Sequence, residues 1–162
     1  NTKCVDVLFL ITMCLKEAAW RQILQTTVYL LREVERQMNY IVMTNNPLVL
    51  SKLNDTHDVI YQELSYEGLL KLVRDRIFEG HRLLTHPLSG SVKPNETPYK
   101  SVLLSGQKEK IDEESVRLIE SAILACQKFQ DKSKSYKEEV YKDFQLVDWT
   151  LLESGLASAD AW

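Results

Sequence analysis

Short apolar runs alternate with amphipathic stretches along most of this chain, and this alternation is the feature that most restricts its fold. The runs expected to form strands are 40–44, 58–64, 81–85 and 101–105. Strands that alternate with helices are typical of parallel sheets covered by helices. The sequence therefore predicts an α/β fold: a small, mostly parallel sheet of three to four strands with helices packed on it. The direction of the strand at 101–105 is left open.

Several helix boundaries carry clear signals. Asn46 can cap a helix that begins at Pro47, and Ser65 can cap the next one, because their side-chain oxygens accept bonds from free N–H groups. Gly80 can end that second helix in a left-handed conformation.

Two long helices are expected to close the chain. Their apolar faces are predicted to be Val116, Ile119, Ile123 and Cys126 in the first helix, and Val140, Phe144, Val147 and Leu151 in the second. The single α/β domain is expected to span residues 38–153, followed by a loosely ordered tail at 154–162.

The first 37 residues differ from the rest of the chain. The apolar run 4–15 is interrupted by an acidic residue and is shorter than the roughly 20 residues that a membrane span needs. One interpretation is an N-terminal extension that forms an amphipathic helix as far as about residue 30. The other is that residues 1–37 are a translated upstream region, because codons for the Arg-Glu-Val at 32–34 can spell a ribosome-binding sequence before a start at Met38.

Charge and cysteine content exclude several classes of function. The 20 basic and 23 acidic residues are interspersed and give a net charge of −3, so no broad basic field favours nucleic acid. The three cysteines lack Cys-x-x-Cys spacing, which fits a reducing compartment and argues against a disulfide framework or a zinc site. We therefore expect a cytoplasmic protein with no metal, no cofactor, no nucleic-acid partner and no membrane span.

The most unusual segment is the stretch 85–101, which we call the Thr85–Ser101 loop. It contains Pro87, Pro94 and Pro98, and prolines this dense exclude a helix or a central strand. A long structureless loop in a compact domain is usually functional or disordered, and the prolines favour a fixed path. A preformed loop loses less entropy on binding, so the sequence predicts a rigid binding or docking element.

Within this loop, the turn Ser89-Gly90-Ser91 and Lys93 could bind an anion, because hydroxyls, backbone N–H groups and an ammonium are donors. An ordinary tight turn explains the same serines, and the spacing is not that of a P-loop. His86 could be a general acid/base, but no nucleophile motif accompanies it. The remaining candidates in the loop are Thr85, Asn95, Glu96 and Lys100.

Other candidate ligand-binding residues lie outside the loop. Ligands of α/β sheets bind beyond the carboxyl ends of strands, which places Thr44, Asn45 and Asn46 beside the loop. Arg74 could reach a carboxylate or phosphate, although a solvated helix face with an intrahelical ion pair is the favoured explanation. His81 is the last candidate, and the histidines are poorly spaced for a metal site.

Together these residues resemble one known family. The segments that carry the resemblance are Thr44-Asn45-Asn46-Pro47, Arg74-Asp75-Arg76 with Gly80-His81, and the whole Thr85–Ser101 loop. From about Met38 to the last helix, the chain is similar to GrdX, a small protein encoded beside the components of glycine, sarcosine and betaine reductase in anaerobic amino-acid fermenters. The resemblance implies a role with that selenium-dependent reductase system and supplies no catalytic residues.

Two functions of different kinds follow. The first is a non-catalytic accessory protein that binds a reductase component or a small anionic metabolite through the Thr85–Ser101 loop. The alternative is a small enzyme that acts on a phosphorylated or carboxylated metabolite, with His86 as acid/base. In that enzyme, Lys93 and the turn 89–91 would hold the anion. The two closing helices could also support a homo-oligomer.

Overall fold

The computed structural model describes residues 20–22, 24–28, 40–90, 93–94, 96–129, 132 and 134–160. The chain divides into two units, Asn1–Arg36 and Gln37–Trp162. In the first unit the described residues are helical, and the side chains of Trp20, Leu24 and Val28 are exposed. The rest of the predicted N-terminal extension lies outside the described residues, and so does Met38, the proposed start. Both interpretations of residues 1–37 therefore stay predictions.

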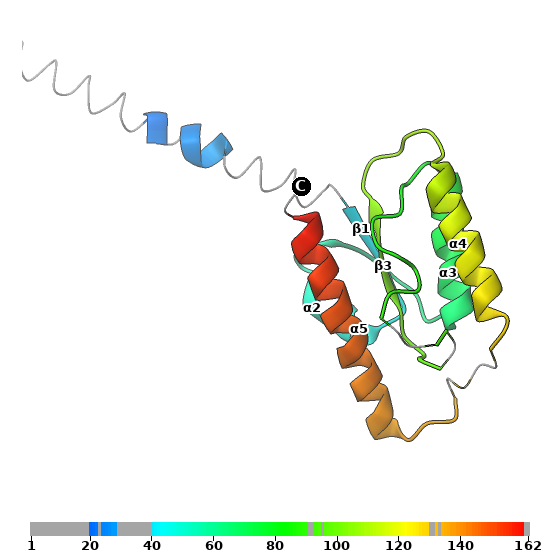
Figure 1. The fold of residues 1–162 in the computed structure, drawn as a ribbon. Helices are drawn as coiled ribbons and strands as arrows, with labels where there is room; N and C mark the ends of the chain where they lie inside the picture. The colour runs from blue at the N-terminus through cyan, green and yellow to red at the C-terminus, as the bar shows by residue number, and fades with distance from the viewer. Residues whose placement is uncertain are drawn as a thin grey trace, which may run out of the picture. The chain divides into compact units, whose positions relative to one another are not determined.

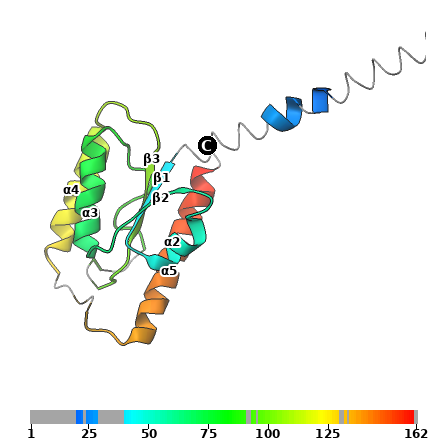
Figure 2. The same cartoon turned by 180° about the vertical axis from the view of Figure 1, so that it is seen from behind.

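The second unit is built on a sheet with the strand order β2-β1-β3 (Figures 1 and 2). Its described elements are β1 (Tyr40–Thr44), α2 (Pro47–Leu53), β2 (Asp58–Tyr61), α3 (Tyr66–Phe78), β3 (Ser101–Ser105), α4 (Glu113–Cys126) and α5 (Glu138–Ala159). β1 pairs with β2 in parallel and with β3 antiparallel. The prediction of an α/β fold is confirmed, but the sheet is mixed rather than mostly parallel, and it has three strands.

The antiparallel direction of β3 has a simple origin. The segment 82–85, predicted as part of a strand, makes one antiparallel bridge between Leu83 and Leu104 of β3. This segment therefore runs parallel to β1. The loop after it reverses the chain, so β3 runs antiparallel to both and lies between the segment and β1. The segment is not a regular strand, because Leu103 N donates to the Thr85 side-chain Oγ1, at 2.9 Å, and not to a backbone carbonyl.

The segment 81–85 closes the outer edge of β3. Leu84 N donates to Leu103 O at 2.9 Å, and Ser105 N donates to Arg82 O at 2.8 Å. The His81 ring donates from Nδ1 to Ser105 O at 2.7 Å, because a carbonyl oxygen can only accept. An open strand edge would offer these groups to another chain, so β3 is protected from edge-to-edge pairing.

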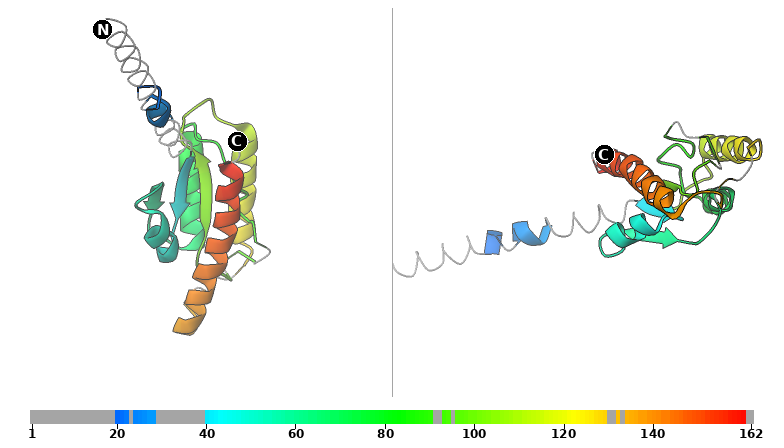
Figure 3. Two further views of the ribbon diagram at one scale, coloured as in Figure 1. Left: turned by 90° about the vertical axis from the view of Figure 1, so that its left-hand side faces the viewer. Right: turned by 90° about the horizontal axis from the view of Figure 1, so that it is seen from below.

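Helices cover both faces of the sheet (Figures 1 and 3). α3 and α4 pack against one face, around Met43, Val102 and Leu104. α2 and α5 pack against the other face, around Val42 and Leu103. Neighbouring residues of one strand thus face opposite layers, as the two-residue period of a strand requires.

α5 buries a different face from the one predicted. Trp149, Leu152 and Leu156 lie in the core, whereas the predicted Val147 and Leu151 are 45% and 37% exposed. Two stripes at helical spacing exist on this helix, and contact with α2 and β3 selects the one that includes Trp149. The helix also continues to Ala159, so residues 154–159 are not a loosely ordered tail.

The predicted helix boundaries agree with the structure at three sites. Asn46 caps α2 by accepting from Leu48 N, with Pro47 at the first helical position, and Ser65 caps α3 by accepting from Gly68 N. Gly80 follows the end of α3 with φ of 104°. A side chain at Gly80 would clash with the carbonyl oxygen of Glu109, whose own N–H donates to Gly80 O at 2.8 Å.

Gly80→Ala should therefore lower the free energy of unfolding by about 1–3 kcal/mol, because the variant combines a disfavoured positive φ with a backbone clash. Urea unfolding followed by circular dichroism measures the change. The matched control is Gly106→Ala, since among the described glycines only Gly80 and Gly90 have positive φ. Equal stability of the Gly80 variant and the wild type would contradict this prediction.

Candidate functional site

Buried polar side chains gather at the carboxyl end of β1. We call them the buried polar cluster, and its members come from β1, the segment after it, the start of β3 and α5. They are Thr44, Asn45, Asn46, Lys100, Ser101 and Asp148. The loop and the end of β1 therefore do meet, in the place that the sequence predicted for Thr44, Asn45, Asn46 and Lys100.

Asn45 joins three stretches of backbone. Its Nδ2 donates to the carbonyl oxygens of Leu64 and Pro98, each at 2.8 Å, and its Oδ1 accepts from Lys100 N at 2.8 Å. Both amide donors and the amide oxygen are thus engaged within the protein. The predicted ligand-binding residue Asn45 holds the end of the Thr85–Ser101 loop against β1.

Asp148, which sequence reasoning missed, is the anionic centre of the cluster. Its Oδ1 accepts from Ser101 N at 2.8 Å, and its Oδ2 accepts from Ser101 Oγ at 2.7 Å and from Asn46 Nδ2 at 2.9 Å. The available signal was weak: a single acidic residue between Val147 and Trp149 on a helix that packs onto the sheet.

The hydroxyl groups of the cluster form a chain with one direction. Ser101 Oγ donates to Asp148, so Thr44 Oγ1, which lies 2.7 Å from Ser101 Oγ, must be the donor in that contact. Thr44 Oγ1 in turn accepts from Asn46 N at 2.9 Å. Successive bonds that point toward a carboxylate polarise one another, which strengthens the chain.

Lys100 is the cationic member of the cluster, and the residue is 3% exposed. Its Nζ donates to Ser89 O at 3.1 Å and to Ser89 Oγ at 2.8 Å. Burial lowers the pKa of the Lys100 ammonium, and the nearby Asp148 charge opposes this shift. Burial likewise raises the pKa of the Asp148 carboxyl, against the effect of its donors Asn46 and Ser101 and of the Lys100 charge.

The Thr85–Ser101 loop is held at several points besides its ends. Tyr66 Oη donates to Pro87 O at 3.2 Å, and Tyr136 Oη donates to Glu96 O at 2.7 Å. His86 Nδ1 accepts from Leu88 N at 3.1 Å. Gly90, with φ of 110°, lies where a side chain would clash with Leu151 of α5. These contacts support the predicted fixed path for the described part of the loop.

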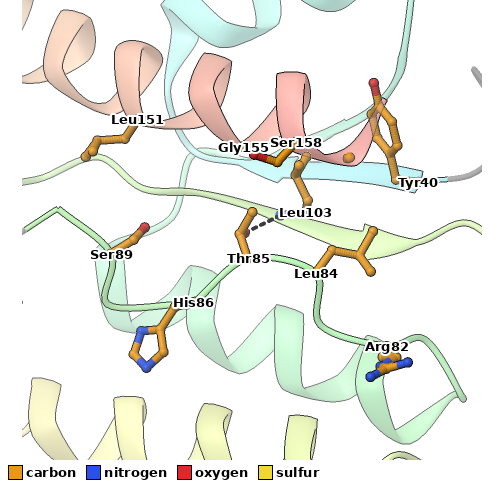
Figure 4. Close-up of a pocket in the computed structure, with 11 residues that line it drawn as sticks. Tyr40, Arg82, Leu84, Thr85, His86, Ser89, Leu103, Leu151, Gly155 and Ser158 are labelled. Atoms are coloured by element: carbon orange, nitrogen blue, oxygen red, sulfur yellow. Dashed lines mark hydrogen bonds between the residues drawn. The ribbon is translucent and has the colours of Figure 1, made fainter. Parts of the chain in front are cut away.

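A groove with a volume of about 800 Å³ runs between the segment 82–89 and α5 (Figure 4), and we call it the loop groove. Thr85 and Gly155 both line it and lie close together, because a side chain at Gly155 would press on Thr85 Cγ2. Its lining mixes apolar and polar side chains, and the residues are Tyr40, Arg82, Leu84, Thr85, His86, Ser89, Leu103, Leu151, Gly155, Ser158 and Ala159.

A second depression, of about 600 Å³, lies at the carboxyl ends of β1 and β2, the edge where the sequence places ligands. Its lining includes Asn45, Tyr61, Glu63, Tyr99 and Lys134. Burial raises the pKa of the Tyr61 hydroxyl, and the neighbouring Glu63 adds to this effect. The Asn45 side chain is engaged in bonds to the backbone, so it does not offer its amide to a ligand in this depression.

Several predicted site residues do not join either group. Arg74 forms ion pairs with Asp75 and Glu120 on the exposed surface of α3 and α4, as expected for a solvated helix face. His81 lies at the opposite end of β3 from the cluster, bonded to Ser105.

The remaining loop candidates are also dispersed. Lys93 is exposed and lies 4.0 Å from Glu96, which pairs with Lys132 at 3.6 Å. Ser91 and Asn95 lie outside the described residues. The anion site predicted from Ser89, Gly90, Ser91 and Lys93 therefore stays a prediction.

No group of three or more His, Cys, Asp or Glu side chains in the part of the chain that the structure describes could hold a metal ion. No helix among the described residues is long and apolar enough to cross a membrane.

The raised pKa of Asp148 predicts a pH dependence of stability. An unfolded aspartate titrates near pH 3.9, so above this pH the folded protein retains a proton that the unfolded chain has lost. The free energy of unfolding of the wild type, minus that of Asp148→Asn, should therefore fall as the pH rises from about 4 toward neutrality. Urea unfolding of both proteins at several pH values measures this difference.

The matched control is Asp143→Asn, which removes an exposed carboxylate from the same helix. It should change stability by less than about 0.5 kcal/mol across this range. If the free energy of unfolding of the wild type, minus that of Asp148→Asn, grows with pH, the cluster favours the charged carboxylate. This result would refute the prediction.

Comparison with known proteins identifies the family. A family model described as GrdX-like protein matches residues 41–157, which is most of the chain and runs from the second residue of β1, through the Thr85–Ser101 loop, to Ala157 of α5. No curated protein and no solved structure matches the chain. The resemblance drawn from the sequence is thus confirmed, and the chain belongs to the GrdX-like family.

Proposed function

We propose that this chain is a non-catalytic accessory protein of a glycine, sarcosine or betaine reductase system in the cytoplasm. It binds a reductase component or a small anionic metabolite through the Thr85–Ser101 loop. Membership of the GrdX-like family supports the metabolic setting. A family name is an association, so the mode of action has to be argued from the site.

The observation that supports the proposal is that hydrogen bonds hold the described part of the loop, whose residues Thr85, His86 and Ser89 line the loop groove. Bonds from Tyr66, Asn45 and Lys100 hold the loop in place. A surface that is preformed loses less conformational entropy when it binds. The arrangement therefore suits recognition of a partner or ligand.

Apolar side chains at the loop groove favour a protein partner. Leu84 and Leu151 both line the groove and are 45% and 37% exposed. Val147, one turn before Leu151 on α5, is exposed as well. Exposed apolar side chains that gather at a groove are typical of interaction sites, and a reductase component is the occupant that the family setting supports.

The environment of His86 gives less support to the enzymatic alternative. Because His86 Nδ1 accepts from Leu88 N, the ring serves to shape the turn at 86–89. Figure 4 shows the ring pointing away from α5 and the far wall of the groove. Lys93, the cation that the enzyme reading requires, pairs with Glu96 instead.

A capture experiment tests the proposal. The tagged full chain is mixed with extract from cells grown on glycine, and the reductase subunits that it retains are identified. The wild type should retain a reductase subunit. Leu151→Arg and Leu84→Arg should each reduce the retained amount at least about tenfold, because a charge is placed on the apolar part of the groove. Leu146→Arg is the matched control, since Leu146 is an exposed leucine of α5 that does not line the groove.

Two results would refute the protein-partner form of this proposal. One is that the wild type retains no reductase subunit. The other is that the Leu151 and Leu84 variants retain as much as the Leu146 control.

A further inference from the structure

Lys100 is a buried cation whose partners are uncharged. Both bonds from its Nζ go to oxygens of the single residue Ser89. Among the described residues, no carboxylate forms an ion pair with this ammonium within 4.0 Å. Burial of an ammonium without a close counter-ion lowers the free energy of unfolding. The position of such a group beside a groove therefore needs an explanation.

The nearest anionic residue does not neutralise Lys100 by contact. Asp148 already accepts three bonds, from Asn46 and from two groups of Ser101. Lys100 and Asp148 both line a small cavity of about 20 Å³, together with Tyr66, Thr97 and Tyr99. A cavity of this size has room for about one water molecule. An ammonium carries three N–H groups, and Ser89 accounts for two of them.

Ser89 separates this cavity from the loop groove. Ser89 and Leu151 line both spaces. They lie together at one end of the loop groove, and Tyr40 and Arg82 lie toward the other end (Figure 4). The Ser89 residue is exposed, so rotation of its side chain breaks only the bond from Nζ to Oγ, while the bond from Nζ to the backbone carbonyl of Ser89 stays in place.

We propose that Lys100 is the recognition group for a carboxylate or phosphate at this end of the loop groove. The Ser89 Oγ occupies the position that one oxygen of the bound anion takes. The proposal deepens the proposed function, on which it rests, by naming the chemical class of the small ligand. Leu84, Leu103 and Leu151 would contact a short apolar body attached to the anion. An oxyanion brings the negative charge that the Ser89 hydroxyl lacks, which favours exchange of this hydroxyl for the ligand.

The test is a titration of the full chain with inorganic phosphate and with propionate at constant ionic strength, followed by calorimetry and by NMR. At least one of the anions should bind saturably, and the uncharged propionamide should not bind. Binding of phosphate alone assigns a phosphoryl ligand, whereas binding of propionate alone assigns a carboxylate.

Four variants locate the site. Lys100→Met should weaken anion binding at least about tenfold, whereas Lys71→Met, which removes an exposed lysine from α3, should leave it unchanged. Ser89→Asp places a carboxylate beside Nζ and should weaken binding to the same extent while keeping Lys100. Ser89→Ala removes one competing oxygen and should leave the affinity equal or higher.

The proposal is overturned if neither anion binds saturably to the wild type, or if Lys100→Met or Ser89→Asp binds as the wild type does. Should Lys100→Met fail to fold, Ser89→Asp decides the question. Capture of a reductase component depends on Leu84 and Leu151 instead. Its success alongside failed anion titrations would reject the anion site and leave the accessory function standing.

Discussion

The carboxylate of Asp148 is the interaction on which the rest of the domain depends. It accepts from the backbone N–H of Ser101, the first residue of β3, and from the side chain of Asn46, just after β1. One side chain of α5 thus ties the helix to both antiparallel strands. Without it, the Ser101 N–H would be buried at the sheet edge with no acceptor, and an unsatisfied buried group of this kind costs about 1–3 kcal/mol.

The loop groove is a consequence of how the edge of β3 is closed. Every second N–H group of β3 points away from β1. Ser101 N donates to Asp148, Leu103 N to the Thr85 side chain, and Ser105 N to Arg82 O. The segment 82–85 is therefore fixed along β3, and α5 is fixed at the far end of the same strand. Gly155 lets the helix approach Thr85, so two rigid walls face each other across the groove.

The two buried charges of the cluster are used differently. Asp148 is surrounded by neutral donors that belong to the core, and its role is to hold secondary structure together. Lys100 is bonded to one exposed residue of the loop, and only its bond to the Ser89 hydroxyl can be exchanged by rotation of a side chain. This asymmetry is the reason for proposing Lys100, and not Asp148, as the charge that takes part in recognition.

The sequence by itself determined what depends on neighbouring residues. The strands at 40–44 and 101–105 follow from short apolar runs, and the caps at Asn46 and Ser65 follow from local hydrogen bonding; all of these appear in the structure. Only the tertiary structure decided the direction of β3, the buried face of α5 and the partners of Asp148 and Lys100. Two stripes of α5 satisfy the same helical period, and a lone aspartate or lysine has no local signal for its partner. The strand direction, the buried helix face and the hydrogen-bond partners depend on which distant segments come into contact. Apolar side chains are buried and polar groups find their partners only when the helices have packed on the sheet.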